Sequence, residues 1–232
     1  MLSSKIMEYN IHIGLDEPHQ QAFDVCRDSI LQYPSKHTIN THAINYNTVE
    51  KYNRIRDEFE STQFSFARFF VPWESDFTGV SMFVDGDFLF LRPIDQLLDL
   101  YDPSYAVMCC PHDYTPVGHE KMDGKIQSIY PRKNWSSLMM FNNEHPDVRK
   151  LTPDVVNTQS GKFLHRFEWV SDEIGYLPVE WNWLVGWYDE TPSFHPRALH
   201  YTEGGPWLEE FSDCSYSDVW YDHAQKFGHV GL

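Results

Sequence analysis

Short apolar runs recur along the chain, separated by stretches in which apolar residues follow helical spacing. The apolar runs predict strands at residues 9–15, 42–47, 80–84, 88–91, 105–110, 136–141 and 198–201. Helical spacing predicts helices after Pro18, over 49–59, over 61–72 with Pro72 at its end, after Pro93, and over most of 148–167. Strands that alternate with helices favour an α/β fold with helices on the faces of a sheet.

Two stretches depart from this alternation. Residues 111–133 form a long, polar, glycine-containing segment, which is typical of a loop that covers an active site. Residues 180–188 are aromatic and irregular in pattern. No internal repeat and no low-complexity linker is visible, so we expect a single domain.

Charge narrows the classes of function. The 232 residues contain 18 Lys and Arg against 34 Asp and Glu, a formal net charge of −16. A protein this acidic repels a phosphate backbone, which argues against a general nucleic-acid binder. A small diphosphate ligand is repelled too, unless a cation or a local basic cluster meets it. Any anion chemistry here therefore points to a metal.

The four cysteines, Cys26, Cys109, Cys110 and Cys214, form no C-x-x-C pair, which argues against a zinc site or a disulfide framework. The N-terminal residues lack the apolar segment of a signal peptide, and no apolar run is long enough to span a bilayer. The sequence predicts a cytoplasmic protein with reduced thiols, and leaves peripheral membrane contact open.

Asp85-Gly86-Asp87 directly follows the buried strand predicted at 80–84. Residues i and i+2 that leave a strand face the same side, so both carboxylates can converge on one cation. Gly86 lacks a Cβ, which lets the chain turn and a ligand approach. Ligands of α/β sheets bind beyond the carboxyl ends of the strands, and hard divalent cations take oxygen ligands. The alternative is an ordinary acidic turn.

His200 lies near the end of the strand predicted at 198–201, just before Gly204 and Gly205. With the two carboxylates it offers two oxygens and one nitrogen, a set that suits Mn²⁺ better than Mg²⁺. Backbone N–H groups of the glycine pair can cradle phosphate oxygens. A hydrogen-bonded core histidine and a plain tight turn are the alternatives.

Basic residues are scarce, so their positions are informative. Arg68 lies among apolar residues in the helix predicted at 61–72, and Arg132 and Lys133 lie on the long loop. Each is placed where it could meet a phosphate. A structural ion pair for Arg68 and a solvated surface charge for the other two are the alternatives.

Several long segments resemble a known family. The strand followed by Asp-x-Asp, the Arg-bearing helix before it and the C-terminal His…Gly…Pro-Trp are similar to glycosyltransferase family eight, which includes glycogenin and bacterial lipopolysaccharide galactosyltransferases. The stretches TQFSFARFFVP, MFVDGDFLFL, YPRKNWSSLMMFN, LPVEWNWLVG and HYTEGGPW look most like a group of bacterial and viral glycosyltransferase-like proteins.

The resemblance covers nearly the whole chain and implies a GT-A fold. This is an α/β fold with a mixed, mainly parallel central sheet flanked by helices. It would make one domain of residues 1–232, with a nucleotide-binding half at 1–110 and an acceptor-side half at 111–232.

The resemblance also implies roles for individual residues. Asp85, Asp87 and His200 would bind the metal. Asp87 would act in catalysis together with an acid beneath the donor sugar, for which Glu168 and Asp172 are the candidates. The donor-binding set would be Gly14, Asp16, Arg68, Asp85, Gly86, Arg132, Lys133, Asn134, Ser136, Ser137, Gly204 and Gly205.

One departure from the family concerns the diphosphate. Family eight usually has a lysine just before the terminal Pro-Trp, and here that position is Gly205. The phosphate charge must then be met by the metal with backbone N–H groups, or by Arg132, Lys133 or Arg68.

The implied activity is a metal-dependent hexosyl transfer from a UDP-sugar to a glycan or other hydroxyl acceptor, with retention of anomeric configuration. Mn²⁺ is the expected cofactor and Mg²⁺ the alternative. The acceptor-side candidates are Trp181, Asn182, Trp183 and Trp207, with core packing as the alternative for the rings. Two other functions stay open: a sugar-nucleotide nucleotidyltransferase, which the acidic GLDEPHQ segment disfavours, and a non-catalytic sugar-nucleotide or glycan-binding protein on the same scaffold.

Overall fold

A six-stranded sheet in the order β2-β1-β3-β8-β5-β9 forms the centre of the molecule. The computed structural model describes residues 6–55, 60–112, 120–121, 125–126, 132–188 and 195–229. The strands of this sheet are β1 (Glu8–Gly14), β2 (Thr38–Ile44), β3 (Val80–Val84), β5 (Val107–Cys109), β8 (Leu138–Asn142) and β9 (Gly175–Tyr176). Within it β8 runs antiparallel to both neighbours and the other ladders are parallel. The predicted mixed, mainly parallel sheet is confirmed.

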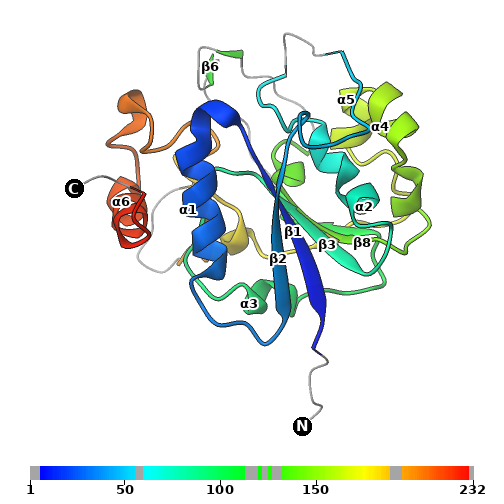
Figure 1. Cartoon of the computed structure of the whole chain (residues 1–232), viewed down its shortest axis with the longest axis horizontal. Helices are drawn as coiled ribbons and strands as arrows, with labels where there is room; N and C mark the ends of the chain where they lie inside the picture. The colour runs from blue at the N-terminus through cyan, green and yellow to red at the C-terminus, as the bar shows by residue number, and fades with distance from the viewer. Residues whose placement is uncertain are drawn as a thin grey trace.

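Helices cover both faces of this sheet, with α1 (Gln20–Leu31) on one face and α2 (Val71–Glu74), α4 (Pro153–Thr158) and α5 (Gly161–His165) on the other (Figure 1). Successive residues of a strand point to opposite faces. Ile13 of β1 accordingly belongs to the same core cluster as Phe23 of α1, and Phe83 of β3 to the same cluster as Leu164 of α5. Strands covered on both faces read as continuous apolar runs, and all five residues of β3 are buried.

A second, three-stranded sheet joins the C-terminal part of the chain to the end of β3. It is built from β10 (Trp183–Leu184), β11 (Ala198–His200) and β4 (Phe88–Phe90). It packs on α6 (Ser217–Lys226), while α3 (Asp95–Leu98) packs below α1. A short pair, β6 (Glu120–Lys121) and β7 (Lys125–Ile126), completes the described strands. Because β4 follows Asp87 directly, its pairing with β11 brings His200 to the end of β3.

Several element predictions need correction. Pro72 does not end a helix: it lies in the first turn of α2, where its missing N–H is not needed. The described part of the helix predicted at 49–59 is not helical, because the Asn45 carboxamide accepts the N–H groups of Asn47 and Thr48 and forms a turn. Residues 148–167 divide into a 3-10 turn and two short helices, each capped by a hydroxyl, from Thr152 and Ser160. Most of the loop predicted at 111–133 lies outside the described residues.

Other expectations concern the thiols and the membrane. All four cysteines are free, and burial raises the pKa of Cys109 and Cys110 well above the usual value of a thiol. Among the described residues no helix is both long and apolar enough to cross a membrane.

Candidate metal and nucleotide site

Two carboxylates and one imidazole meet where β3 ends. The Nε2 atom of His200 lies 3.3 Å from Oδ1 of Asp87 and 3.9 Å from Oδ2 of Asp85. One ligand atom from each of the three residues lies within 4.8 Å of the others. Carboxylate oxygens with one imidazole nitrogen form a donor set that divalent first-row metals accept. The residues present therefore fit a divalent cation, as the sequence predicts.

Backbone pairing holds the three residues in place. The register of β4 and β11 sets His200 opposite Phe88, and the two rings stack with centroids 4.3 Å apart. The N–H of Tyr201 donates to the carbonyl of Asp87 at 3.1 Å, and the N–H of Asp85 donates to the carbonyl of Ser137 at 2.9 Å. The triad is thus built from two segments that are distant in sequence and held together by backbone contacts.

Arg68 orients one of the carboxylates. This arginine is 6% exposed, and its Nη1 lies 3.0 Å from Oδ1 of Asp85. The same nitrogen donates to the carbonyl of Ser136 at 2.8 Å. Because Oδ1 of Asp85 is bound by the guanidinium, Oδ2 is the oxygen directed at His200. Arg68, expected near the donor, is held on the metal-site carboxylate itself.

Asn182 orients the histidine. We expected Asn182 on the acceptor side, but it is 0% exposed and lies behind the triad. Its Oδ1 lies 2.8 Å from Nδ1 of His200, and its Nδ2 donates to Oγ of Ser137 at 2.9 Å. A carboxamide oxygen can only accept, so Nδ1 of His200 carries a proton and Nε2 is the nitrogen that faces the carboxylates. In this orientation Nε2 is the atom available to a metal.

We expect Asn182→Ala to weaken Mn²⁺ binding by roughly 10–100-fold, the usual cost of losing the group that orients a metal-binding histidine. Isothermal titration with Mn²⁺ measures the effect. Asn143→Ala is the matched control, because Asn143 is equally buried and bonds with Ser81 and Thr78 instead. It should lower the melting temperature and leave the Mn²⁺ dissociation constant unchanged. An unaltered dissociation constant in Asn182→Ala would contradict the orienting role.

Gly86 allows the end of β1 to pack against the Asp-x-Asp turn. A Cβ added at Gly86 would lie 2.1 Å from the carbonyl oxygen of Gly14. A Cβ at Gly14 would in turn lie 2.7 Å from the ring of Phe64. The sequence predicts that Gly86 serves the turn and the ligand. The structure gives a different primary reason, which is the close approach of two backbone segments.

Gly86→Ala should therefore destabilise the protein by about 1–3 kcal/mol, since the added methyl meets backbone that cannot move aside as a side chain would. Gly161→Ala is the control: its Cβ would lie 3.4 Å from the end of the Phe66 ring, in the first turn of α5. Alanine is the better helix former there. Urea unfolding of both variants measures the difference, and equal free energies of unfolding would refute the packing argument.

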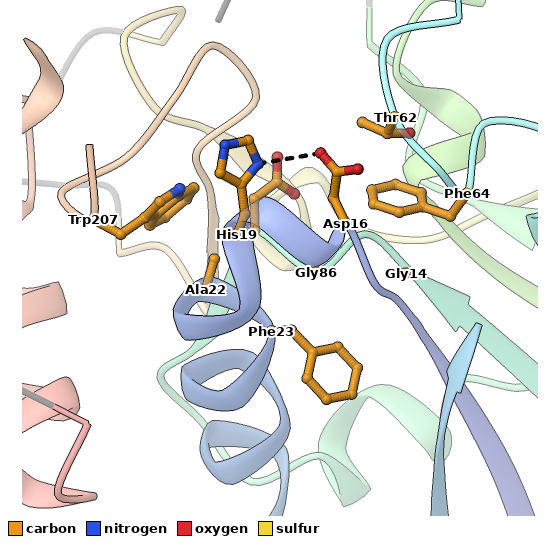
Figure 2. Close-up of a pocket in the computed structure, with 10 residues that line it drawn as sticks. Gly14, Asp16, His19, Ala22, Phe23, Thr62, Phe64, Gly86 and Trp207 are labelled. Carbon is orange, nitrogen blue, oxygen red and sulfur yellow. Dashed lines mark ion pairs between the residues drawn. The ribbon is translucent and has the colours of Figure 1, made fainter. Parts of the chain in front are cut away.

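An open pocket lies beside the triad, between the end of β1, the start of α1 and Trp207 (Figure 2). Its lining is mainly apolar and aromatic with a few polar groups, as is usual for small-ligand pockets. The lining residues are Gly14, Asp16, His19, Ala22, Phe23, Thr62, Phe64, Gly86, Asp87 and Trp207. Asp87 thus belongs to both the triad and the pocket.

Asp16 and His19 form the polar part of this pocket. The side chains face each other, with Nδ1 of His19 3.2 Å from Oδ2 of Asp16 (Figure 2). The other oxygen of Asp16 accepts the N–H of Gln63 at 3.2 Å. Gly14 and Asp16, expected in the donor-binding set, line this pocket, and their role in nucleotide binding stays a prediction. His19 was not among the candidates, and only its position shortly after the first strand could have suggested it.

The segment after the long loop approaches the triad through its serines. Ser136 contacts Arg68, and Ser137 contacts Asn182. Asn134 adopts a left-handed conformation with φ of 62°. Lys133, beside them, is buried at 6% exposure. Arg132 is exposed and donates to the carbonyl of Arg166 at 2.5 Å. Ser136 also bonds with His165 at 2.9 Å, a contact that the sequence does not reveal.

The glycine pair forms a turn next to the pocket. Gly204 has φ of 136°, and a Cβ there would lie 2.6 Å from the ring of Phe211. Gly205 is closely covered by Trp207, whose ring atoms a Cβ would approach to 2.2 Å. Both glycines are therefore required by the local packing, and their phosphate-binding role stays a prediction.

The acceptor-side tryptophans separate into two groups. Trp181 and Trp183 are 1% and 5% exposed and belong to core clusters, so packing accounts for them. Trp207 lines the pocket with Gly14 and Asp16, which is the donor side by our assignment. Trp181 and Trp183 are buried because β10 and the turn before it are covered on both sides. Residue type alone does not indicate this burial.

The two candidate acids both lie at the surface. Glu168 pairs with Lys162, its Oε1 3.7 Å from Nζ, and Asp172 is exposed on the segment that leads to β9. Neither is part of the triad. Their assignment as the acid beneath the donor sugar remains a prediction.

The buried His112, near His200, is paired with the partly buried Tyr188. Nδ1 of His112 is 2.6 Å from the hydroxyl of Tyr188. Burial, and then the neighbouring His200, lower the pKa of His112 to about 3, so its imidazole is neutral at physiological pH.

The strand order, the Asp-x-Asp turn after β3 and the pocket at the carboxyl end of the sheet define the GT-A fold of glycosyltransferases. A structure of LgtC superposes with a TM-score of 0.62 at 12% identity, covering 96% of this chain and 97% of that chain. GlyE of Streptococcus pneumoniae TIGR4 gives 0.61 at 14% identity over 94% of this chain and 60% of its own. This chain thus spans about 60% of the length of GlyE. A glycosyltransferase involved in glycosylation of the PBCV-1 major capsid gives 0.53 at 12% identity.

Within this fold the chain belongs to the family of Protein CDI of Arabidopsis thaliana. The two sequences are 45% identical over 231 residues, which cover 97% of this chain and 89% of that protein. No family model matches the chain.

Proposed function

We propose that this protein is a metal-dependent glycosyltransferase that moves a sugar from a UDP-sugar to a hydroxyl of a glycan acceptor in the cytoplasm, with retention of anomeric configuration. The observation that supports it most is the convergence of Asp85, Asp87 and His200 beside an open pocket at the end of β1. In a protein with net charge −16, an anionic donor needs a cation at such a place.

Each group has a role in this proposal. Asp85 and Asp87 hold the cation through their oxygens, and His200 through Nε2. Mn²⁺, or Mg²⁺, would supply Lewis-acid stabilisation of the charge on the departing diphosphate. Gly14 and Asp16, at the end of β1, would bind the uridine, and the turn at Gly204 would meet the phosphates with backbone N–H groups.

Other residues orient these groups and stabilise charge on the sugar. Arg68 fixes Asp85 and Asn182 fixes His200, so the site is preorganised before the donor binds. Asp172 or Glu168 would stabilise positive charge on the sugar ring. The missing family lysine is compensated in this account by the cation and backbone donors, since Arg68 is occupied by Asp85.

Isothermal titration of the wild-type protein with UDP, in Mn²⁺ and then in EDTA, tests the proposal. We expect binding in Mn²⁺ that EDTA removes, and hydrolysis or transfer for at least one UDP-sugar. Absence of UDP binding under both conditions would overturn the proposal. Pyrophosphate release from a nucleoside triphosphate and a sugar phosphate would instead establish a nucleotidyltransferase.

A further inference from the structure

An aromatic pair at the surface lies near the triad and has no part in the proposed donor site. Tyr176 of β9 is 66% exposed, and its ring meets that of Trp135 edge to face, with centroids 6.2 Å apart. The Arg132 guanidinium lies 5.5 Å from the centre of the Trp135 ring. We call Arg132, Trp135 and Tyr176 the aromatic platform.

Two side chains of the platform are held in place. The indole N–H of Trp135 donates to the carbonyl of His112 at 3.2 Å, which fixes the plane of the ring. The Arg132 guanidinium is held by its bond to the carbonyl of Arg166. The backbone of Tyr176 is held by strand pairing with Cys109 of β5. Side chains held in this way lose little conformational entropy when they bind a ligand.

The platform is also continuous with the candidate active site. Trp135 begins the 3-10 turn that carries Ser136 and Ser137, the serines that contact Arg68 and Asn182. Tyr176 lies three strands from the end of β3, in the order β3-β8-β5-β9. At about 4.8 Å per strand this is roughly 14 Å. A short oligosaccharide can span that distance from the donor.

We propose that the aromatic platform binds the sugar units of a neutral oligosaccharide acceptor that lie behind its reacting end. This rests on the proposed function and assigns its acceptor class. The flat ring of Tyr176 offers an apolar face to the C–H face of a pyranose, and its hydroxyl and the Arg132 donors offer hydrogen bonds to sugar hydroxyls. In this proposal the exposed ring of Tyr176 and the partly buried ring of Trp135 take the place of Trp181 and Trp183, which are buried.

Other macromolecular ligands fit less well. The net charge of −16 opposes a nucleic acid. A stable protein interface needs about 800 Å² on each partner, far more than three side chains provide. A ligand that is small, flat-faced and rich in hydroxyls matches the platform best.

The test uses isothermal titration of the full chain, with UDP and Mn²⁺ present, against four tetrasaccharides: maltotetraose, cellotetraose, xylotetraose and mannotetraose. We expect wild type to bind at least one of them. Tyr176→Ala should weaken that binding about tenfold, equal to about 1.4 kcal/mol, and Tyr176→Phe should retain most of it. Because Tyr176 is largely exposed, its loss should leave the melting temperature unchanged.

Tyr33→Ala is the matched control. Tyr33 is 37% exposed and lies between α1 and β2, at the opposite edge of the sheet, and its loss should not change tetrasaccharide binding. Failure of all four tetrasaccharides to bind, or equal binding by Tyr176→Ala and wild type, would overturn the inference. UDP binding is recorded separately: tetrasaccharide binding that depends on Tyr176 without any UDP binding would sustain the platform and reject the proposed donor.

Discussion

Asp87→Ala is expected to abolish sugar transfer and metal-dependent UDP binding while the fold is retained. Asp87 belongs to both the triad and the pocket, and its Oδ1 is the carboxylate oxygen nearest Nε2 of His200. Removing it leaves one carboxylate and one imidazole, too few protein ligands to hold a divalent cation against water. A Lewis acid is worth several kcal/mol in the transition state, so the rate should fall on the order of 10³-fold.

The loss of transfer is measured as release of UDP from a UDP-sugar, and the loss of binding by titration with UDP in Mn²⁺. Far-UV circular dichroism verifies the fold. Asp222→Ala removes an equal charge from the exposed side of α6 and should behave as wild type. This control separates the local effect from a change in net charge. Normal UDP binding by Asp87→Ala in Mn²⁺ would show that the metal site is misassigned.

The sequence predicts the Asp85–Asp87 pair from local rules, whereas His200 joins it only through the tertiary pairing of β4 with β11. The spacing of Asp85 and Asp87 after an apolar strand places both carboxylates on one side, whatever the rest of the fold does. The alternation of apolar runs and helical periods predicts an α/β sheet, and the GT-A fold is implied by the resemblance of several segments to known glycosyltransferases. Membership of glycosyltransferase family eight stays a prediction, because structural neighbours at 12–14% identity show the fold alone.

The roles of Asn182 and the tryptophans could not be predicted, because they depend on tertiary packing. Asn182 stands between two aromatic residues in the sequence, which suggests a ligand surface. In the structure the chain turns so that its carboxamide faces His200, while both neighbouring rings enter the core. The same limit applies to Tyr176, whose two-residue strand β9 is too short to give a periodic signal.

Two of the three residues of the triad have a partner behind them. Arg68 holds Asp85, and Asn182 holds His200. Both partners are bonded in turn to the 3-10 turn at Trp135–Ser137, through Ser136 and Ser137. This turn therefore connects the metal site to the aromatic platform. A substitution of Arg68 or Asn182 should alter the geometry of both.

Arg68→Met should destabilise the metal-free protein by about 3–5 kcal/mol, the usual cost of removing one partner of a buried ion pair. The side chains of Arg68 and Asp85 are 7% and 14% exposed, so the remaining carboxylate would be left without its cation in a poorly hydrated place. Urea unfolding in EDTA measures the loss. In Mn²⁺ the loss should be smaller, since the metal ion compensates the charge of Asp85 and stabilises the folded state by mass action.

The double variant Arg68→Met/Asp85→Asn gives the decisive comparison. Since it leaves no unpaired charge, it should be more stable in EDTA than Arg68→Met alone. Arg27→Met is the matched control, because Arg27 pairs with Asp24 and Asp28 at the surface, where an ion pair contributes at most about 1 kcal/mol. Strictly additive effects of the two single substitutions would show that Arg68 does not act through Asp85. A double variant more stable than Arg68→Met, with no response to Mn²⁺, would establish that Arg68 and Asp85 are coupled and that Asp85 is required to hold the metal.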